Sequence, residues 1–303
     1  MRRRFITSDV FTDRAFGGNP LAVLPDATGL STDQMQRLAR EFNLSETAFV
    51  LPAESPGHDR KVRIFVPTKE IPFAGHPTIG TAITLAHLGA FDLAGERVSI
   101  TFEMAAGLVP VTIHVNDGKP AAATLTAPRR PEIAEAPTVE QMAALLSLGK
   151  AQIMRTGAAS AGNPFLMVQV EDRAALRQAR IDMAVLDRIG DGLYAQEPFV
   201  FTDDAPSGAD FRARMFAPLS GIPEDPATGS AVAAFGGWLG HHDALADGTI
   251  RKVIAQGLEM GRPSRLEVEV DKQGGAVIAV RVTGSAVLIS EGEIEVPAPM
   301  AQG

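Results

Sequence analysis

The pattern of apolar and polar positions divides most of the chain into short strands separated by turns. Short runs that alternate in polarity or are wholly apolar, bounded by glycine, proline and charged residues, are typical of strands. In the first half such runs cover residues 5–7, 21–24, 47–51, 61–66, 98–102, 108–115 and 122–125. In the second half they cover residues 165–170, 199–202, 211–216, 252–255, 266–270 and 277–282.

Helices are predicted where apolar residues recur at helical spacing. Residues 31–41 are the clearest case, with one apolar side and Ser31 or Thr32 as the N-terminal cap. Two more helices are expected near 139–146 and 183–189. Strands and helices therefore mix in both halves.

Two further runs contain no Asp, Glu, Lys or Arg: residues 71–91 and 226–240. Both are rich in Gly, Ala, Ser and Thr, and apolar residues recur at helical spacing from Ile79 onward. A helix without a polar side is buried on all sides, and small residues let other backbone approach closely. Each run is therefore predicted to be a central helix surrounded by sheet. Neither is expected to span a membrane, because the first contains prolines and glycines and the second is too short.

The surroundings of the two runs repeat in the same order. "GNPLAVL" starts at Gly18 and "GNPFLMV" at Gly162, while "RIFVP" starts at Arg63 and "RMFAP" at Arg214. "HPTIGTA" and "DPATGSA" follow, and the copies lie about 150 residues apart in each case. The chain is thus predicted to hold two copies of one βαβ-rich unit, each of roughly half its length. The boundary is placed in the proline-rich stretch after residue 127, which gives domains 1–127 and 128–303, with the last ~20 residues able to pack back on the first domain.

The start of each central helix is where the copies differ. Pro77 and Pro226 are expected at the first helical residue, where a missing N–H costs nothing, which places His76 and Asp225 at the caps. Free N–H groups and the positive end of the helix dipole attract anions. If the two halves face each other by pseudo-symmetry, both helix starts point into one cleft. Such a cleft suits a small carboxylic acid.

Composition and charge narrow the function further. Apolar residues make up 45% and charged residues 21%, as in an ordinary globular protein. The net charge of −8, with no basic run beyond residues 2–4, argues against nucleic acid or an anionic membrane as a partner. No secretory leader is expected, and we expect a cytoplasmic protein. The chain contains no cysteine, which excludes disulfides, thiolate zinc sites and cysteine catalysis.

Several ordered motifs carry a resemblance to a known family. They are "DVFTDRAFGGNPLAVL" from Asp9, "SETAFV" from Ser45, "FAGHPTIGTA" from Phe73, "EDPATGSA" from Glu224 and "QGLEMGRPS" from Gln256. Through them the chain resembles the phenazine-biosynthesis PhzF-like family, which shares the diaminopimelate-epimerase fold. The resemblance implies an α+β fold of two pseudo-symmetric domains, each a curled, mostly antiparallel sheet or barrel around a central helix. It also implies one active site in the cleft between them.

The resemblance also implies roles for individual residues. Glu46 matches the catalytic glutamate of the family, although an exposed strand start is the simpler interpretation of its sequence context. At the mouth of an apolar pocket, desolvation can raise the pKa of a glutamate, which suits a residue that takes and returns a proton. His76 and Asp225 would bind and polarise the substrate, and Gly229 and Ser230 would hold its carboxylate. We expect the side chains of the first three to lie within about 10 Å of one another across the domain interface.

Asn19, Gly75, Gly80 and Thr81 complete the candidate substrate-binding residues. Asn19 and Thr81 also have simpler structural alternatives. Asn19 is typical of a turn, and a hydroxyl such as that of Thr81 commonly bonds back to its own helix. An Asp such as Asp225, taken alone, is more often a plain helix cap, and a lone buried histidine such as His76 is usually structural.

The missing cysteines distinguish between reactions of this fold. Epimerases that resemble this chain use two thiols, one at each helix start, on opposite faces of a carbon. A single glutamate can instead move a proton between two carbons on one face, which is an isomerisation. We therefore expect a cofactor-independent isomerase of a small unsaturated carboxylic acid, without metal, flavin or nicotinamide, and a homodimer. The alternatives are a lyase or hydratase on the same scaffold, or a non-catalytic protein that binds small acids.

Overall fold

The computed structural model describes residues 1–242 and 246–298, and its contacts divide the chain into two compact units. Unit 1 comprises Met1–Pro128 together with the chain from Thr283 onward, and unit 2 comprises Arg129–Val282. The division lies one residue after the boundary expected from the sequence. The last strand, β18 (Ala286–Glu295), belongs to unit 1 and pairs with the first strand, β1 (Arg2–Val10).

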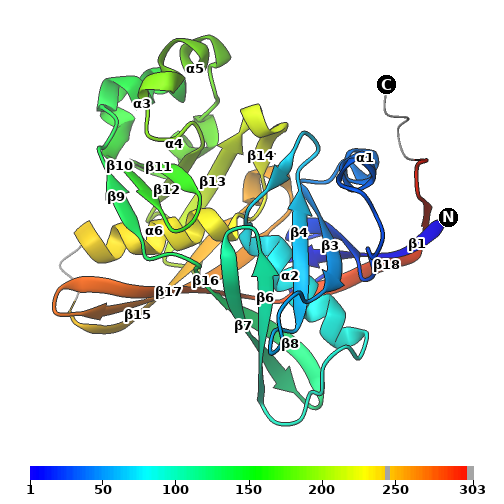
Figure 1. The fold of residues 1–303 in the computed structure, drawn as a ribbon. Coiled ribbons are helices and arrows are strands. Elements are labelled where there is room, and N and C mark those ends of the chain that lie inside the picture. The colour runs from blue at the N-terminus through cyan, green and yellow to red at the C-terminus, as the bar shows by residue number, and fades with distance from the viewer. Residues whose placement is uncertain (243–245, 299–303) are drawn as a thin grey trace. The chain divides into compact units, whose positions relative to one another are not determined.

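Unit 1 is a mostly antiparallel sheet around one long helix (Figure 1). Besides β1 and β18 its elements are β2 (Asn19–Leu24), α1 (Thr32–Phe42), β3 (Glu46–Pro52), β4 (Arg60–Phe65), β5 (Glu70–Ile71), α2 (Gly75–His87), β6 (Arg97–Met104), β7 (Gly107–Asn116) and β8 (Lys119–Thr126). The pairs β18–β1, β1–β2, β3–β4, β4–β5, β6–β7 and β7–β8 are antiparallel. The pairs β2–β3 and β4–β6 are parallel.

Unit 2 repeats this arrangement. Its main elements are β9 (Glu132–Ala134), α3 (Val139–Leu145), β10 (Ile153–Ser160), β11 (Pro164–Val170), α4 (Arg173–Gln178), α5 (Met183–Ile189), β12 (Pro198–Thr202), β13 (Phe211–Ala217), β14 (Ile222–Asp225), α6 (Gly229–His242), β15 (Gly248–Gln256), β16 (Ser264–Gln273) and β17 (Ala276–Gly284). The pairs β9–β10, β10–β11, β12–β13, β13–β14 and β15–β16 are antiparallel, and β11–β12 and β13–β15 are parallel.

The order of antiparallel and parallel pairs is the same in both units. A helix or helix pair follows the second long strand in each, and the long central helix follows a short strand, β5 or β14. Because strand pairing is independent of the short motifs that suggested the repeat, this agreement confirms the α+β fold of two similar domains predicted from the sequence.

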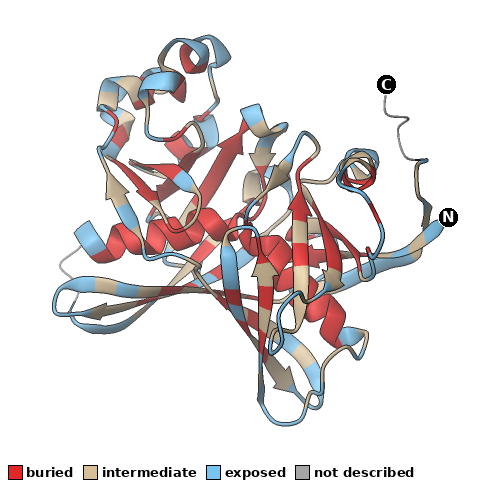
Figure 2. Cartoon of the chain, in the orientation of Figure 1, coloured by how far each residue is buried: buried red, intermediate tan, exposed pale blue. Residues whose placement is uncertain are grey.

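The two central helices are buried along most of their length, as their lack of a polar side predicts (Figure 2). Every residue of α2 from Gly75 to Ala86 is buried, and so is α6 from Gly229 to Gly240. Small residues make this possible. A Cβ on Gly236 would lie 2.7 Å from the Val268 side chain of β16, so the strand can approach the helix only because the side chain is absent.

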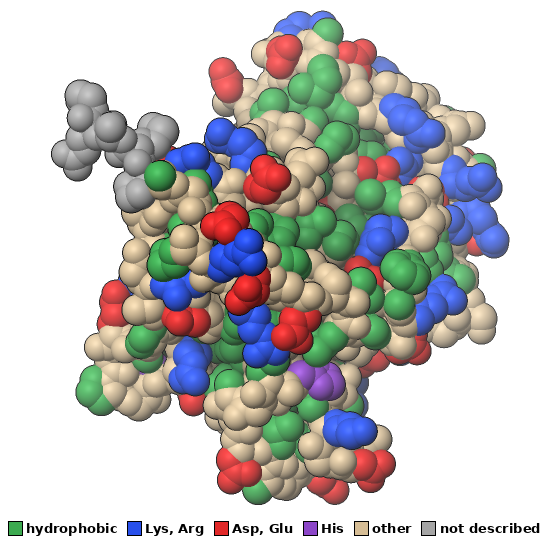
Figure 3. All heavy atoms as spheres, turned by 90° about the vertical axis from the view of Figure 1, so that its right-hand side faces the viewer, with side chains coloured by type: hydrophobic (Ala, Val, Ile, Leu, Met, Phe, Trp, Pro, Cys, Tyr) green, Lys and Arg blue, Asp and Glu red, His purple; other side chains and the backbone are tan. Residues whose placement is uncertain are grey.

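The surface helix α1 begins as the sequence predicts, with Ser31 rather than Thr32 as its cap. Ser31 accepts a hydrogen bond from the Gln34 backbone N–H, and Gln34 returns one to Ser31, which is a capping box. On the face drawn in Figure 3, Lys and Arg are interspersed with Asp and Glu. No helix in the described part of the chain is long and apolar enough to cross a membrane.

Two long strands, β10 and β18, were not predicted. The sequence of β18 shows no clear alternation of apolar and polar positions, and none of its residues is fully buried. The sequence of β10 contains Gly157 and two alanines in its buried part, which are weak strand formers. A Cβ on Gly157 would lie 2.1 Å from the Trp238 indole nitrogen, so the bulk that fills this part of the core comes from α6.

Candidate active site

The starts of the two central helices differ from the sequence prediction. The N-cap of α2 is Ala74, so His76 and Pro77 lie inside the first turn. Asp225 is the last residue of β14 and precedes α6, which begins at Gly229. The assignment of His76 and Asp225 as caps is therefore wrong. The N–H groups of the whole first turn lack partners within the helix, so proline fits at several positions there and does not locate the first one.

The corrected helix starts also change which residues of the two units correspond. Pro72 precedes Gly75 at the same spacing as Pro226 precedes Gly229. Counted from the helix starts, His76 therefore corresponds to Ser230. Asp225 lies on the strand before the helix, where unit 1 has the apolar Ile71. His76 and Asp225 therefore do not occupy equivalent positions in the two units.

In unit 1, three elements bring predicted site residues together. Asn19 opens β2, Glu46 opens the parallel neighbour β3, and His76 lies in the first turn of α2. Asn19 Nδ2 lies 3.2 Å from His76 Nδ1, and the Ser45 hydroxyl lies 2.9 Å from Asn19 Oδ1. Glu46 Oε2 lies 3.5 Å from His76 Nδ1, and only 12% of the Glu46 side chain is exposed. This burial disagrees with the alternative of an exposed strand start.

His76 is neutral near physiological pH. It is 2% exposed, and burial lowers its pKa to about 3, with a smaller opposing effect from the Pro20 carbonyl. Its contact with Glu46 is therefore not an ion pair at neutral pH. Asn19 Oδ1 accepts from Ser45, whereas the polarity of the contact between Asn19 Nδ2 and His76 Nδ1 depends on the imidazole tautomer.

In unit 2, Asp225 is 3% exposed and lies in a hydrogen-bonded group that the sequence did not predict. Thr228 Oγ1 donates to Asp225 Oδ2 over 2.5 Å. Gln256, the last residue of β15, donates from Nε2 to the Asp225 carbonyl over 2.8 Å and to Thr228 Oγ1 over 3.0 Å. Its Oε1 accepts from the Thr228 backbone N–H over 3.1 Å. Neither Thr228 nor Gln256 was singled out from the sequence.

The glycine that follows Gln256 is the sequence feature that could have indicated the hydrogen-bonded group around Asp225. Gly257, directly after Gln256, has φ +75°, which favours glycine. A Cβ there would lie 2.3 Å from the Arg262 carbonyl oxygen and 2.6 Å from that of Pro226. The Gln-Gly pair at the head of "QGLEMGRPS" therefore packs its backbone against the segment that follows Asp225.

The other candidate residues of unit 1 lie on α2. Gly75 begins the helix, and Gly80 faces the strands, where a Cβ would lie 2.6 Å from the side chains of Leu21 and Val10. Thr81 is fully buried, and its hydroxyl has no hydrogen-bond partner among residues 1–242 and 246–298. It does not bond back to its own helix, which was the simpler alternative.

Gly229 and Ser230 begin α6 in unit 2, where both are buried. Asp225 belongs to this unit too, so the predicted approach of Asp225 to Glu46 and His76 across the interface stays a prediction. No group of three or more His, Cys, Asp or Glu side chains that could hold a metal ion lies in the part of the chain that the structure describes.

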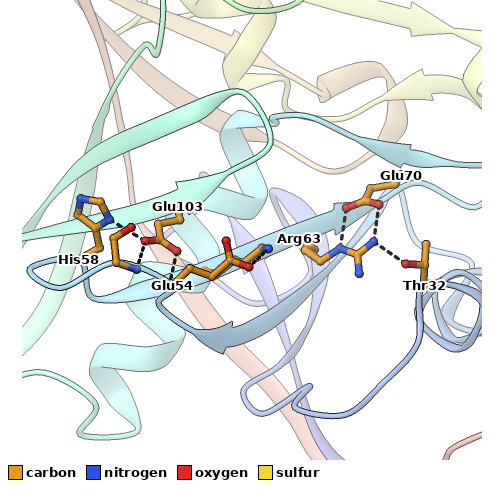
Figure 4. Close-up of polar contacts among 8 residues, drawn as sticks. Thr32, Glu54, His58, Arg63, Glu70 and Glu103 are labelled. Carbon is orange, nitrogen blue, oxygen red and sulfur yellow. Dashed lines mark hydrogen bonds and ion pairs between the residues drawn. The ribbon is translucent and has the colours of Figure 1, made fainter.

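The repeated Arg-x-Phe-x-Pro motif has a structural role in both units. Arg63 binds Glu70 with two hydrogen bonds of 2.8 and 2.6 Å and also contacts Thr32 (Figure 4). Arg214 binds Glu224 in the same two-fold manner, over 2.8 and 2.7 Å. Glu70 and Glu224 lie on β5 and β14, the short strands that lead to the central helices. The motif arginines therefore anchor the approach to each helix start.

Comparisons with known proteins cover nearly the whole chain. A family model described as phenazine biosynthesis-like protein matches residues 8–292. An uncharacterised isomerase of Mesorhizobium japonicum is 40% identical, over 96% of this chain and 98% of its own. The trans-2,3-dihydro-3-hydroxyanthranilate isomerase of Pseudomonas aeruginosa is 36% identical, over 95% of this chain and 98% of its own. The crystal structure of a phenazine biosynthesis protein of Bacillus anthracis superposes with a TM-score of 0.85 at 26% identity, covering 98% of this chain and 100% of that one.

Proposed function

Because this chain belongs to the phenazine biosynthesis-like protein family, and its relatives are named isomerases, we propose that it is an isomerase that uses Glu46 as its single acid and base. It moves a proton between two carbons of a small unsaturated carboxylic acid. The observation that carries the proposal is the largely buried Glu46 carboxylate, 3.5 Å from a neutral His76.

The proposed reaction needs no redox partner. Glu46 takes a proton from one carbon, and the electron pair of that C–H bond shifts into a new double bond as the old one moves. The far end of the system then takes the same proton back from Glu46, so atoms and charge balance. A buried carboxylate suits both steps because solvent competes little for the proton it carries.

Neighbouring groups would hold the substrate while the proton moves. The neutral His76 ring can donate a hydrogen bond without becoming a competing acid, since burial keeps its pKa at about 3. Asp225 would accept a hydrogen bond from the substrate. The backbone N–H groups of Gly229 and Ser230, at the start of α6, would hold its carboxylate. Asn19, Gly75 and Thr81 would line the same site, and no metal or organic cofactor takes part in the scheme.

The test compares two matched substitutions, with trans-2,3-dihydro-3-hydroxyanthranilate as the first probe, after the substrate named for the Pseudomonas aeruginosa relative. Glu46→Gln keeps the shape but cannot act as a base, so turnover should fall by at least ~10²-fold with little change in KM. Glu41→Gln, on the exposed side of α1, should behave as the parent. Parental turnover of Glu46→Gln would pass the role of base to Asp225 or His76.

Isotope content separates the proposed shuttle from other proton chemistry. In deuterated water the product should carry less than full deuterium at the newly protonated carbon, because one carboxyl group returns the proton it took. Full incorporation would contradict a shielded shuttle. An elimination product would identify a lyase, and tight binding without turnover would identify a binding protein.

A further inference from the structure

The hydrogen bonds around Asp225 run in one forced direction. The backbone N–H of Thr228 can only donate, so the Gln256 atom that faces it is the amide oxygen. The Gln256 amide nitrogen must then face the Asp225 carbonyl and the Thr228 hydroxyl, and it can only donate to both. Because the hydroxyl oxygen accepts from Gln256, its own proton is left for Asp225 Oδ2, 2.5 Å away.

We propose that Thr228 and Gln256 are positioning residues that hold Asp225 as an ionised hydrogen-bond acceptor in one orientation. The inference rests on the proposed role of Asp225 toward substrate. A hydroxyl that donates to a carboxylate favours its ionised form, and a charge-assisted bond of this length restricts its rotation. Asp225 is thereby kept from acting as an acid that would compete with Glu46.

An ordinary helix cap does not account for the arrangement. Thr228 directly precedes α6, and its carbonyl accepts the first helical hydrogen bond, from Val232. A threonine at this position usually turns its hydroxyl oxygen toward the free N–H groups of the first turn. Here the hydroxyl accepts from Gln256 and donates to Asp225 instead. The Thr228 side chain therefore binds the Asp225 carboxylate instead of capping the helix.

The backbone is built to keep Gln256 in reach. Parallel pairing places Ala213 of β13 beside Gln256, and antiparallel pairing places Met215 of β13 beside Asp225. Gly257 packs against Pro226 as described above, which closes the other side. Gln256 itself has no exposed surface, so water cannot take the place of its amide.

Three variants test the direction of the chain of hydrogen bonds. Thr228→Val removes the hydroxyl at constant shape, and Thr228→Ser keeps it. Gln256→Glu keeps the shape but offers only acceptors, so the Thr228 hydroxyl turns to residue 256 and leaves Asp225. Thr84→Val is the matched control, since Thr84 is buried in α2 and its hydroxyl has no hydrogen-bond partner in the described residues.

The direct readout is the carboxyl ¹³C resonance of Asp225 followed through a pH titration. Its midpoint should move to higher pH by about 1 in Thr228→Val and by more in Gln256→Glu, and should return in Thr228→Ser, since one lost donor is worth about one pH unit. Thr84→Val should leave it in place. An unmoved midpoint in a folded Thr228→Val protein would overturn the proposal. If Gln256→Glu does not fold, the Thr228 pair decides alone.

Activity then separates this inference from the proposed function. In Thr228→Val, kcat/KM on the same probe should fall about 10-fold at pH 7, with the acid limb of its pH profile moved upward and Thr228→Ser restoring both. If the parent does not turn over the probe, the proposed function fails while the Asp225 titration still decides the positioning role. If Glu46→Gln alone keeps full activity, the base assignment fails and the Thr228 result stands.

Discussion

The two central helices start in the same way but hold their polar groups differently. In unit 1 the polar residue is His76, inside the first turn of α2, contacted by side chains that open two neighbouring strands. In unit 2 that helical position is Ser230, and the charged residue is Asp225, on the strand before α6. The duplication has kept the helix and its pairing partners. The polar residue that the sequence places in the site lies on the helix in unit 1 and on the preceding strand in unit 2.

The surroundings of these groups differ in how far they fix protons. In unit 2 the Thr228 backbone N–H fixes the orientation of the Gln256 amide, and the Thr228 hydroxyl then donates to Asp225. In unit 1 Ser45 donates to Asn19 Oδ1, but the polarity of the contact between Asn19 and His76 depends on the imidazole tautomer.

The largest effects are expected when the polar side chain near each helix start is removed, one at a time. His76→Ala and Asp225→Ala should each lower kcat/KM by about 10²–10³-fold, with KM raised, because in the proposed reaction each would remove an aligned polar contact to the substrate. Ser230→Ala, at the helical position of His76, should cost only about 10-fold, as for one neutral hydrogen bond.

The matched control for these changes is His58→Ala, on the segment before β4, where His58 binds Glu103 over 2.7 Å (Figure 4). It should leave kcat/KM unchanged. A loss in Ser230→Ala as large as that in His76→Ala would mean that the two starts are functionally equivalent after all.

A smaller effect is expected from the glycines that hold each site. Gly257→Ala and Gly18→Ala should lower the free energy of unfolding by more than about 1 kcal/mol, because each combines positive φ with a Cβ that meets a carbonyl oxygen. Gly29 also has positive φ, at +82°, but open space around it, so Gly29→Ala should cost less. Urea unfolding of the three variants checks this order. Equal losses would show that the close contacts relax.

The smallest effect concerns pH and tests whether His76 is neutral in the folded protein. The folded pKa of His76 is about 3, below the usual 6.5, so below pH 6.5 the unfolded chain takes up a proton that the folded chain refuses. Stability should therefore fall as pH drops, by about 1.4 kcal/mol per pH unit from this group, and should not depend on it above pH 6.5. His76→Asn should reduce this slope in urea unfolding between pH 6 and pH 5. Identical slopes in both proteins would contradict the pKa.

Much of the fold could be predicted because local rules decide it. The central helices lack a charged side and are rich in small residues, and the Ser31–Gln34 capping box fixes the start of α1. The strand β18 could not be predicted, because its partner β1 lies at the other end of the chain and none of its residues is fully buried. Local pattern carries no information on such a pairing.

The candidate site was predictable to the same extent. Asn19, Glu46 and His76 stand in recognisable motifs, and the structure brings them together in unit 1. The predicted helix starts were wrong, because proline is tolerated at several positions around the first turn and Pro77 and Pro226 therefore do not mark the first helical residue. Gln256 could not be predicted, because its contacts with Asp225 and Thr228 form only when the ends of β14 and β15 are brought together by their pairings with β13.

The return of β18 to unit 1 has a consequence for how the protein is made. Unit 2 is one continuous stretch, Arg129–Val282, and all of it has been synthesised before Thr283 is added. Residues 1–128 of unit 1 are synthesised first, but the edge of β1 that pairs with β18 stays unpaired until residues 286–295 have been added. On the ribosome the second half can therefore finish folding before the first half, which carries Glu46.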